Sequence, residues 1–246
     1  MKYFHHVDAR RDQGIPFKTC VEELLACTEA VCGFCGGIPP TFEEGLRAFS
    51  DFAARGDHFR GASDPIFHGS EYLGGGDEHE VRLPTPSASI RLDQEDLGAW
   101  GDPSVVKITY PGLFGLRVVY RQDESRHCTP LEYFERWQLH CEMFGDDAEF
   151  LGVVKTSEGL RTVIRQKLIE GEPASDEEID QFFRGNEWLP FRWNNNLAYF
   201  DEAREVVVSD THPGNLVKMP DGKLAPIDLR VQRAKGGVLD AIRRMI

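Results

Sequence analysis

The stretch Ser209–Leu229, SDTHPGNLVKMPDGKLAPIDL, contains three side chains with oxygen donors, Asp210, Asn215 and Asp228, beside two short turns. The turn residues of THPGN and MPDGK interrupt apolar segments, so the pattern predicts a β-hairpin over residues 216–227. Asp210 and Asn215 precede this hairpin, and Asp228 follows it. Because the two ends of a hairpin lie close together, we expect the three side chains to converge.

The composition is that of a folded protein. The chain has 246 residues, of which 41% are hydrophobic and 28% charged, and this supports an apolar core. The net charge of −13 argues against broad binding to nucleic acid or to anionic membranes. No apolar run is long enough to span a membrane, and MKYFHHVDARRDQ lacks the apolar segment of a signal peptide. We therefore expect a cytoplasmic protein without nucleic-acid or membrane partners.

Hydrophobic periodicity and capping residues predict an alternation of helical and strand-rich regions. Thr129, followed by Pro130 and by Glu132 three residues after the cap, predicts the start of a helix, and Thr41 and Ser175 are expected to cap two more. The predicted helices cover residues 17–31, 41–56, 129–145, a segment after Ser175, and 234–246. The predicted strands cover residues 65–76, 79–83, 87–92, 105–110, 148–154 and 160–169.

Six cysteines are present, and four of them crowd into CVEELLACTEAVCGFC. Cys20 and Cys27 recur with Leu24 at helical spacing, which indicates small core residues on one helix face. The closing pair, Cys32 and Cys35, has the C-x-x-C spacing of a zinc or redox site, although no strand precedes it. Core packing and metal or redox use both stay open for this cluster.

A second polar group stands out upstream, since Lys107 lies in the middle of the apolar strand VVKIT. It follows a glycine-rich turn, GSEYLGGGDEHEV, and precedes the helix that contains several glutamates. Together with D-x-x-x-x-N from Asp210 to Asn215, and Asp228 after the next hairpin, this order resembles protein kinases. The chain is most similar to the small Ser/Thr/Tyr kinase-like domains of polyvalent proteins from phages and mobile elements. The segments that carry the closer resemblance are EHEV, VVKITYPGLFG, YFERWQLHCEMFGDDAEFLGV, IEGEPASDEEI, DTHPGN and PIDL.

The resemblance implies an α+β, two-lobed kinase-like fold with an N-terminal helical extension over residues 1–60. Residues 61–168 would form the N-lobe, a twisted antiparallel sheet with one helix. Residues 169–246 would form a truncated helical C-lobe with the catalytic loop and the metal-binding hairpin.

It also implies an ATP-dependent phosphotransferase that uses Mg²⁺ and acts on a hydroxyl group, most simply that of a protein substrate. The resemblance gives each candidate residue a role. Lys107 would bind phosphates and pair with Glu135, for which Glu132 and Glu142 are alternatives, and Asp210 would accept or orient the proton of the acceptor hydroxyl. The metal ligands would be Asn215 and Asp228. The remaining nucleotide contacts would come from Gly74, Gly75, Gly76, Lys167, Leu168 and Ile169.

Two departures from the kinase pattern leave other functions open. Leu229 and Arg230 follow Asp228 where a typical kinase has Phe and Gly, and only a short segment follows them. DTHPGN also resembles the D-x-H-x-x-N loop of aminoglycoside and choline kinase relatives. A small-molecule kinase and a non-catalytic nucleotide-binding module therefore stay as alternatives.

Overall fold

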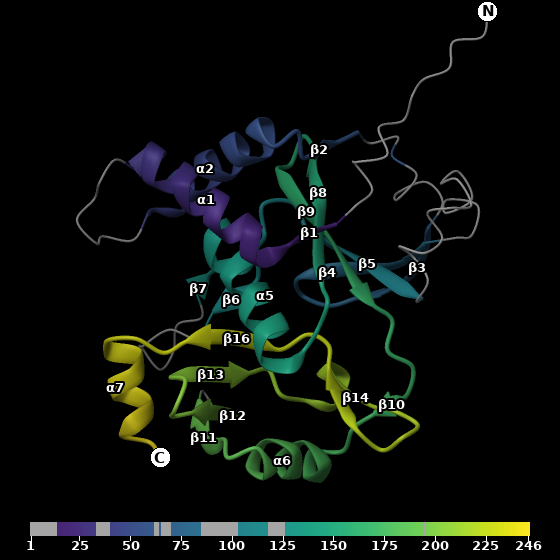
Figure 1. Ribbon diagram of the computed structural model, residues 1–246, viewed down its shortest axis with the longest axis vertical. Helices are drawn as coiled ribbons and strands as arrows, with labels where there is room; N and C mark the ends of the chain where they lie inside the picture. Colours follow the sequence, from purple (N-terminus) through teal and green to yellow (C-terminus); the bar gives the residue numbers. More distant parts are fainter. Residues whose placement is uncertain are drawn as a thin grey trace, which may run out of the picture. The chain divides into compact units, whose positions relative to one another are not determined.

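The computed structural model of the chain describes residues 14–32, 40–61, 64, 70–84, 103–117, 126–193 and 195–246. The chain divides into two compact units (Figure 1). Unit 1 comprises Met1–Phe114 and Asp147–Leu168. Unit 2 comprises Gly115–Asp146 and Ile169–Ile246. The three-part domain division expected from the sequence stays a prediction.

Unit 1 combines two helices with a mostly antiparallel sheet. Its helices are α1 (Phe17–Cys32) and α2 (Phe42–Arg55). Its strands are β1 (Ile15–Pro16), β2 (Phe59–Arg60), β3 (Ser70–Gly75), β4 (His79–Pro84), β5 (Ser104–Thr109), β8 (Glu149–Lys155) and β9 (Leu160–Lys167). The strand order is β1-β8-β9-β5-β4-β3, and β2 pairs with β8 in the only parallel pairing of this sheet among the described residues. The predicted strand over residues 87–92 lies outside the described residues.

The register of the sheet identifies which residues share a face. Directly opposed residues in neighbouring strands project to the same side, and the pairings of Lys107 with Val81 and Ile164 therefore define one row across the sheet. This row consists of Gly74, Val81, Lys107, Ile164 and Phe150. We call this side the Lys107 face.

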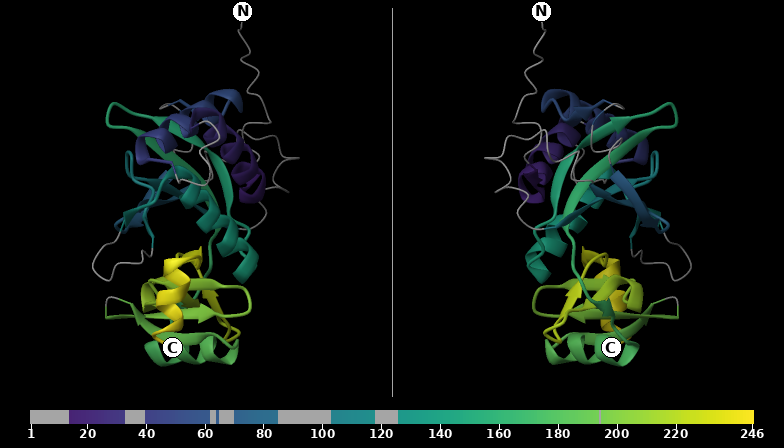
Figure 2. Two further views of the ribbon diagram at one scale, coloured as in Figure 1. Left: turned by 90° about the vertical axis from the view of Figure 1, so that its left-hand side faces the viewer. Right: turned by 90° about the vertical axis from the view of Figure 1, so that its right-hand side faces the viewer.

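Helix α2 covers the Lys107 face beside β8. The ring centroids of Phe52 and Phe150 lie 5.7 Å apart, and Phe52 is buried. The two helices contact each other, and α1 also contacts β8. Figure 2 shows the helices, in purple and blue, from two sides. On α1, Cys20, Leu24 and Cys27 are buried, which confirms the predicted core face of this helix.

Unit 2 contains more strand than the sequence predicted. Its helices are α5 (Pro130–Phe144), α6 (Asp176–Gly185), α7 (Gly237–Arg243) and the short 3-10 helix η3 (Pro213–Asn215). Its strands are β6 (Leu116–Arg117), β7 (Arg126–His127), β10 (Glu172–Pro173), β11 (Leu189–Trp193), β12 (Asn196–Asp201), β13 (Val206–Ser209), β14 (Leu216–Lys218), β15 (Leu224–Pro226) and β16 (Arg230–Arg233).

The prediction of a helical C-lobe is therefore wrong for much of this region. β11, β12, β13 and β16 form a four-stranded antiparallel sheet, and β10, β14 and β15 form a three-stranded one. Successive apolar residues of β12 and β13 face two cores in turn, one shared with α6, where the rings of Phe183 and Tyr199 stack 4.2 Å apart, and one shared with α7. Burial of side chains on both faces of the four-stranded sheet favours strands in this segment.

The local predictions in both units are confirmed. Complete capping boxes begin α2 at Thr41, α5 at Thr129 and α6 at Ser175. The hairpin expected over residues 216–227 is formed by β14 and β15, with Leu216 opposite Pro226. No helix among the described residues is both long and apolar enough to cross a membrane.

Candidate functional site

The loop between β13 and η3 holds Asp210 in an unusual backbone conformation. Its φ angle is +63°, in the left-handed region that non-glycine residues seldom occupy, although Asp tolerates it better than most. The side-chain amide of Asn215 donates a hydrogen bond of 2.9 Å to the carbonyl of Asp210. The backbone N–H of His212 donates to the same carbonyl at 3.1 Å. These contacts fix the backbone that carries the Asp210 carboxylate.

The β14–β15 hairpin brings Asp228 to the same loop. The backbone N–H of Ile227 donates to the carbonyl of Asn215 at 2.9 Å, directly beyond the Leu216–Pro226 pair. Asp210, Asn215 and Asp228 thus lie at one end of the hairpin within unit 2, and each is half-buried. The convergence expected from the sequence is present in the backbone, while the roles of the three residues stay a prediction.

His212 and Thr211 support the loop. His212 caps η3, because its Nδ1 accepts a hydrogen bond of 3.1 Å from the Gly214 N–H. The Thr211 hydroxyl donates to the Leu197 carbonyl at 2.9 Å and so ties the loop to β12. With its Nδ1 engaged in this cap, His212 is a supporting residue of the loop.

The residues at the end of the hairpin fit a magnesium ion. Mg²⁺ prefers hard oxygen ligands and commonly binds through one or two side chains plus substrate phosphates. Because the Asn215 amide nitrogen is engaged by the Asp210 carbonyl, its Oδ1 is directed away from that bond and is left to act as a ligand. Asp228 directly follows Ile227, whose backbone N–H donates to the Asn215 carbonyl. The donor chemistry of this pair therefore suits the ion that the kinase resemblance implies.

Sequence reasoning did not assign a role to Arg230, which the structure places against Asp210. Ser209 and Arg230 are opposed in the β13–β16 pair. An Nη2 atom of Arg230 lies 3.4 Å from Asp210 Oδ2. The pairing joins residues of two strands that are not adjacent in sequence, so hydrophobic pattern alone carries no signal for it.

Lys107 belongs to the sheet of unit 1. It lies in the middle of β5, and only 4% of it is exposed although its neighbours along the strand are apolar. A buried ammonium is costly unless polar or charged groups surround it. Lysines on the rim of a sheet instead place the ammonium in water. Burial at the centre of a strand therefore favours a specific role for Lys107.

The glycine-rich segment belongs partly to a strand and not wholly to a loop. Gly74 and Gly75 lie in β3, and Gly76 begins the turn to β4, where its N–H donates to the His79 carbonyl at 3.1 Å. A Cβ atom built on Gly74 or Gly76 meets nothing within 4 Å. Gly74 shares the Lys107 face, so its backbone is open on the side that Lys107 occupies.

Substitution of Gly74 and of Gly75 by Ala is expected to separate folding from nucleotide binding. A Cβ on Gly75 would lie 2.9 Å from the Tyr110 hydroxyl and 3.0 Å from the His79 carbonyl, so Gly75→Ala should lower the free energy of unfolding by about 1 kcal/mol. Gly74→Ala should leave unfolding by urea unchanged and raise the KM for ATP, because the added methyl group enters the open side. An unchanged KM in folded Gly74→Ala protein would remove Gly74 from the nucleotide site.

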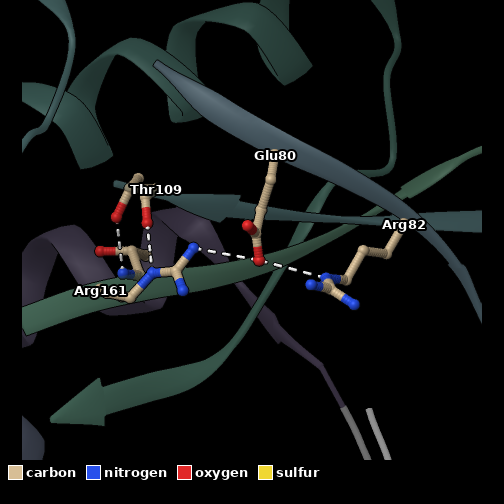
Figure 3. Close-up of polar contacts among 5 residues, drawn as sticks. Glu80, Arg82, Thr109 and Arg161 are labelled. Atoms are coloured by element: carbon tan, nitrogen blue, oxygen red, sulfur yellow. Dashed lines mark hydrogen bonds and ion pairs between the residues drawn. The ribbon is translucent and has the colours of Figure 1, made fainter. Parts of the chain in front are cut away.

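On the opposite face of the sheet, an ion-pair network braces β4 against β9. One oxygen of Glu80 lies 3.1 Å from Arg82 Nε and 3.1 Å from Arg161 Nη2. The Nε of Arg161 donates to the Thr109 carbonyl at 2.7 Å. Figure 3 shows Arg161 reaching past Thr109 of β5 to the Glu80 carboxylate, with Arg82 on the other side. The network joins the strand that follows the glycine-rich turn to the centre of the sheet.

Removal of the charge at the centre of this network is expected to destabilise unit 1. In Glu80→Gln protein, two largely shielded arginines lose their carboxylate, which should lower the free energy of unfolding by about 1–2 kcal/mol. Glu71→Gln, on the exposed part of β3, is the matched control and should change stability by less than about 0.5 kcal/mol. Equal unfolding midpoints of the two variants in urea would show that the network contributes nothing.

The three glutamates of α5 have different surroundings within unit 2. Glu132 completes the capping box with Thr129 and forms an ion pair with Arg117. Glu142 accepts a hydrogen bond from Gln138 and lies 3.8 Å from Arg233. Glu135 is exposed, yet desolvation by the protein atoms around it and, second, the Glu132 carboxylate raise its pKa.

Of these three, Glu132 and Glu142 are engaged by residues of unit 2. The pairing of Lys107 with Glu135 stays a prediction.

The predicted nucleotide-reading connector follows β9. Lys167 is the last residue of that strand and is exposed, and Leu168 donates from its backbone N–H to the Pro103 carbonyl at 2.8 Å. Ile169 is the first residue of the second segment of unit 2. Gln166, just before the connector, is buried and is opposed to Val105 on β5, so it shares the Lys107 face.

The cysteines give no support for a metal site in the part of the chain that the structure describes. Within those residues, no three His, Cys, Asp or Glu side chains come together to hold a metal ion. Burial raises the pKa of the Cys20 thiol strongly, as expected for an inert core cysteine. Cys35, the second residue of the C-x-x-C pair, lies outside the described residues.

Comparison with known families identifies one match. Residues 105–234 match the sequence model of a family described as Serine/Threonine/Tyrosine Kinase found in polyvalent proteins. The matched segment is more than half of the chain and includes Lys107, Asp210, Asn215 and Asp228, whereas Gly74–Gly76 precede it. No curated protein matches the chain.

Proposed function

We propose that this chain, which belongs to the Ser/Thr/Tyr kinases found in polyvalent proteins, transfers the γ-phosphate of ATP to a hydroxyl group of a protein with the help of Mg²⁺. The observation that carries this proposal is the convergence of Asp210, Asn215 and Asp228 at one end of the β14–β15 hairpin. Phosphoryl transfer needs mainly positioning and charge compensation from a protein, and these residues supply both.

In this proposal each residue acts on a stated atom. Asp210 accepts a hydrogen bond from the acceptor hydroxyl and takes its proton as the new O–P bond forms. The bond between the γ-phosphorus and the oxygen that stays with ADP breaks. Asn215 and Asp228 hold Mg²⁺, which neutralises phosphate charge when bound. Lys107 binds the α- and β-phosphates, and the backbone of the β3–β4 turn covers the phosphates.

Labelled ATP tests this function directly. The purified protein is incubated with Mg²⁺ and ATP labelled at the γ-phosphate, with and without a cell lysate, and mass spectrometry locates the label. We expect label on Ser, Thr or Tyr of a protein, and loss of that label in folded Asp210→Asn protein. Label found solely on small molecules would favour a small-molecule kinase. Absence of transfer, with binding of ATP intact, would favour a non-catalytic module.

A further inference from the structure

Arg230 occupies a place that kinases ordinarily give to glycine, two residues after the metal-binding Asp. It begins β16 between Leu229 and Val231, which are both buried in the core of unit 2. Because successive side chains of a strand alternate in direction, Arg230 projects from the opposite side to these core residues. Its side chain is 26% exposed. The strand thus presents a guanidinium group at the end of the hairpin that carries Asp228.

The contact between Arg230 and Asp210 is loose. The closest atoms, Arg230 Nη2 and Asp210 Oδ2, are 3.4 Å apart, whereas a strong charge-assisted hydrogen bond measures about 2.7–2.9 Å. The Nε of Arg230 is buried and has no hydrogen-bond partner among the described residues. A guanidinium group has five N–H donors in a planar fork, so most of its hydrogen-bonding capacity is not used by Asp210.

A cation at this place suits the reaction. During phosphoryl transfer, negative charge spreads over the equatorial oxygens of the transferring group, and an arginine that contacts them accelerates transfer strongly. Asp210 marks where the acceptor hydroxyl binds, and Arg230 lies beside its carboxylate. The pair is half-exposed and its closest atoms are 3.4 Å apart, so the guanidinium group can contact a further oxygen without leaving Asp210.

We propose that Arg230 is a further catalytic residue, which binds an oxygen of the phosphoryl group in transfer while remaining beside Asp210. This inference rests on the proposed function of the Asp210–Asp228 site. It assigns the guanidinium group to the transferring phosphate and not to the nucleotide in its ground state. Arg230 should therefore affect binding of a transition-state mimic far more than binding of Mg·ADP.

Binding of Mg·ADP with and without aluminium fluoride, followed by thermal shift and calorimetry, tests this role without any acceptor. In Arg230→Gln protein, we expect the Kd of Mg·ADP to stay within about threefold of the wild-type value. The Kd of Mg·ADP with aluminium fluoride should rise by about 10²-fold, as for loss of one donor to developing charge. Arg230→Lys should recover only part of the loss, because an ammonium lacks the planar fork.

The matched control is Arg233→Gln. Arg233 lies on the same strand but is exposed and faces Glu142 at 3.8 Å, so its replacement should leave both Kd values unchanged. If Arg230→Gln is too unstable, Arg230→Lys carries the test. Wild-type protein that does not bind Mg·ADP would overturn the proposed function and this role with it. Equal tightening by aluminium fluoride in wild-type and Arg230→Gln protein would overturn the role of Arg230 alone.

Discussion

In Asp228→Asn protein, transfer of phosphate from ATP is expected to fall by about 10³-fold. The asparagine keeps the size of the side chain but removes the charge that binds Mg²⁺, and the metal is worth several kcal/mol of transition-state stabilisation. Because Asp228 is half-buried at the end of the hairpin and Ile227 keeps its backbone bond to Asn215, the fold should be retained. The measurement is the initial rate of transfer at saturating Mg²⁺ and ATP, with circular dichroism to confirm folding.

Asp221→Asn is the control for this prediction. Asp221 lies in the turn of the same hairpin, where it is exposed and pairs with Lys223 at 2.9 Å. Its replacement removes the same charge from the same hairpin, and we expect a rate within about twofold of the wild-type value. Comparable rates for Asp228→Asn and wild-type protein would exclude Asp228 as a metal ligand.

Replacement of Lys107 by Met is expected to lower the efficiency with which the protein uses ATP. Loss of a charge-assisted contact to phosphate costs about 1.5–3 kcal/mol, so kcat/KM for ATP should fall by about 10- to 10²-fold. Methionine preserves most of the side-chain volume in the buried centre of β5. The strand pairings of Lys107 with Val81 and Ile164 involve the backbone and should persist.

Lys155→Met provides the comparison for Lys107. Lys155 is the exposed last residue of β8 in the same sheet, and its replacement removes a lysine from an exposed strand end while Lys107 and the residues opposed to it stay unchanged. We expect unchanged kinetics for this variant. A Lys107→Met protein with the same kcat/KM as Lys155→Met would show that Lys107 has a structural role only.

Local features of the fold could be read from the sequence. The Thr129 and Ser175 caps each depend on a side chain three residues further on, and such short-range hydrogen bonds leave a direct signal in the sequence. The β14–β15 hairpin is likewise defined by the turn residues between its strands. Convergence of Asp210, Asn215 and Asp228 was predictable because the hairpin alone produces it.

Long-range pairings could not be read in the same way. β13 pairs with β16 across the intervening hairpin, and no local pattern specifies that partner. The pairing makes unit 2 rich in strands and places Arg230 at Asp210, and both were missing from the prediction. Gly74 and Gly75 were assigned both to the end of a predicted strand and to a glycine-rich turn, and opposition to β4 places them in β3. In each case, tertiary pairing overrides local propensity.

The most direct test of the proposal that Lys107 and Asp228 serve the same nucleotide is covalent labelling with an acyl-phosphate derivative of ATP. The amine of a lysine at the phosphates attacks the acyl carbonyl, forms an amide and releases ATP. Mass spectrometry should find the label on Lys107, with suppression by Mg·ATP and at least about tenfold less label in Asp228→Asn protein. Label spread over exposed lysines such as Lys155, unaffected by Mg·ATP or by the Asp228 substitution, would contradict the proposal.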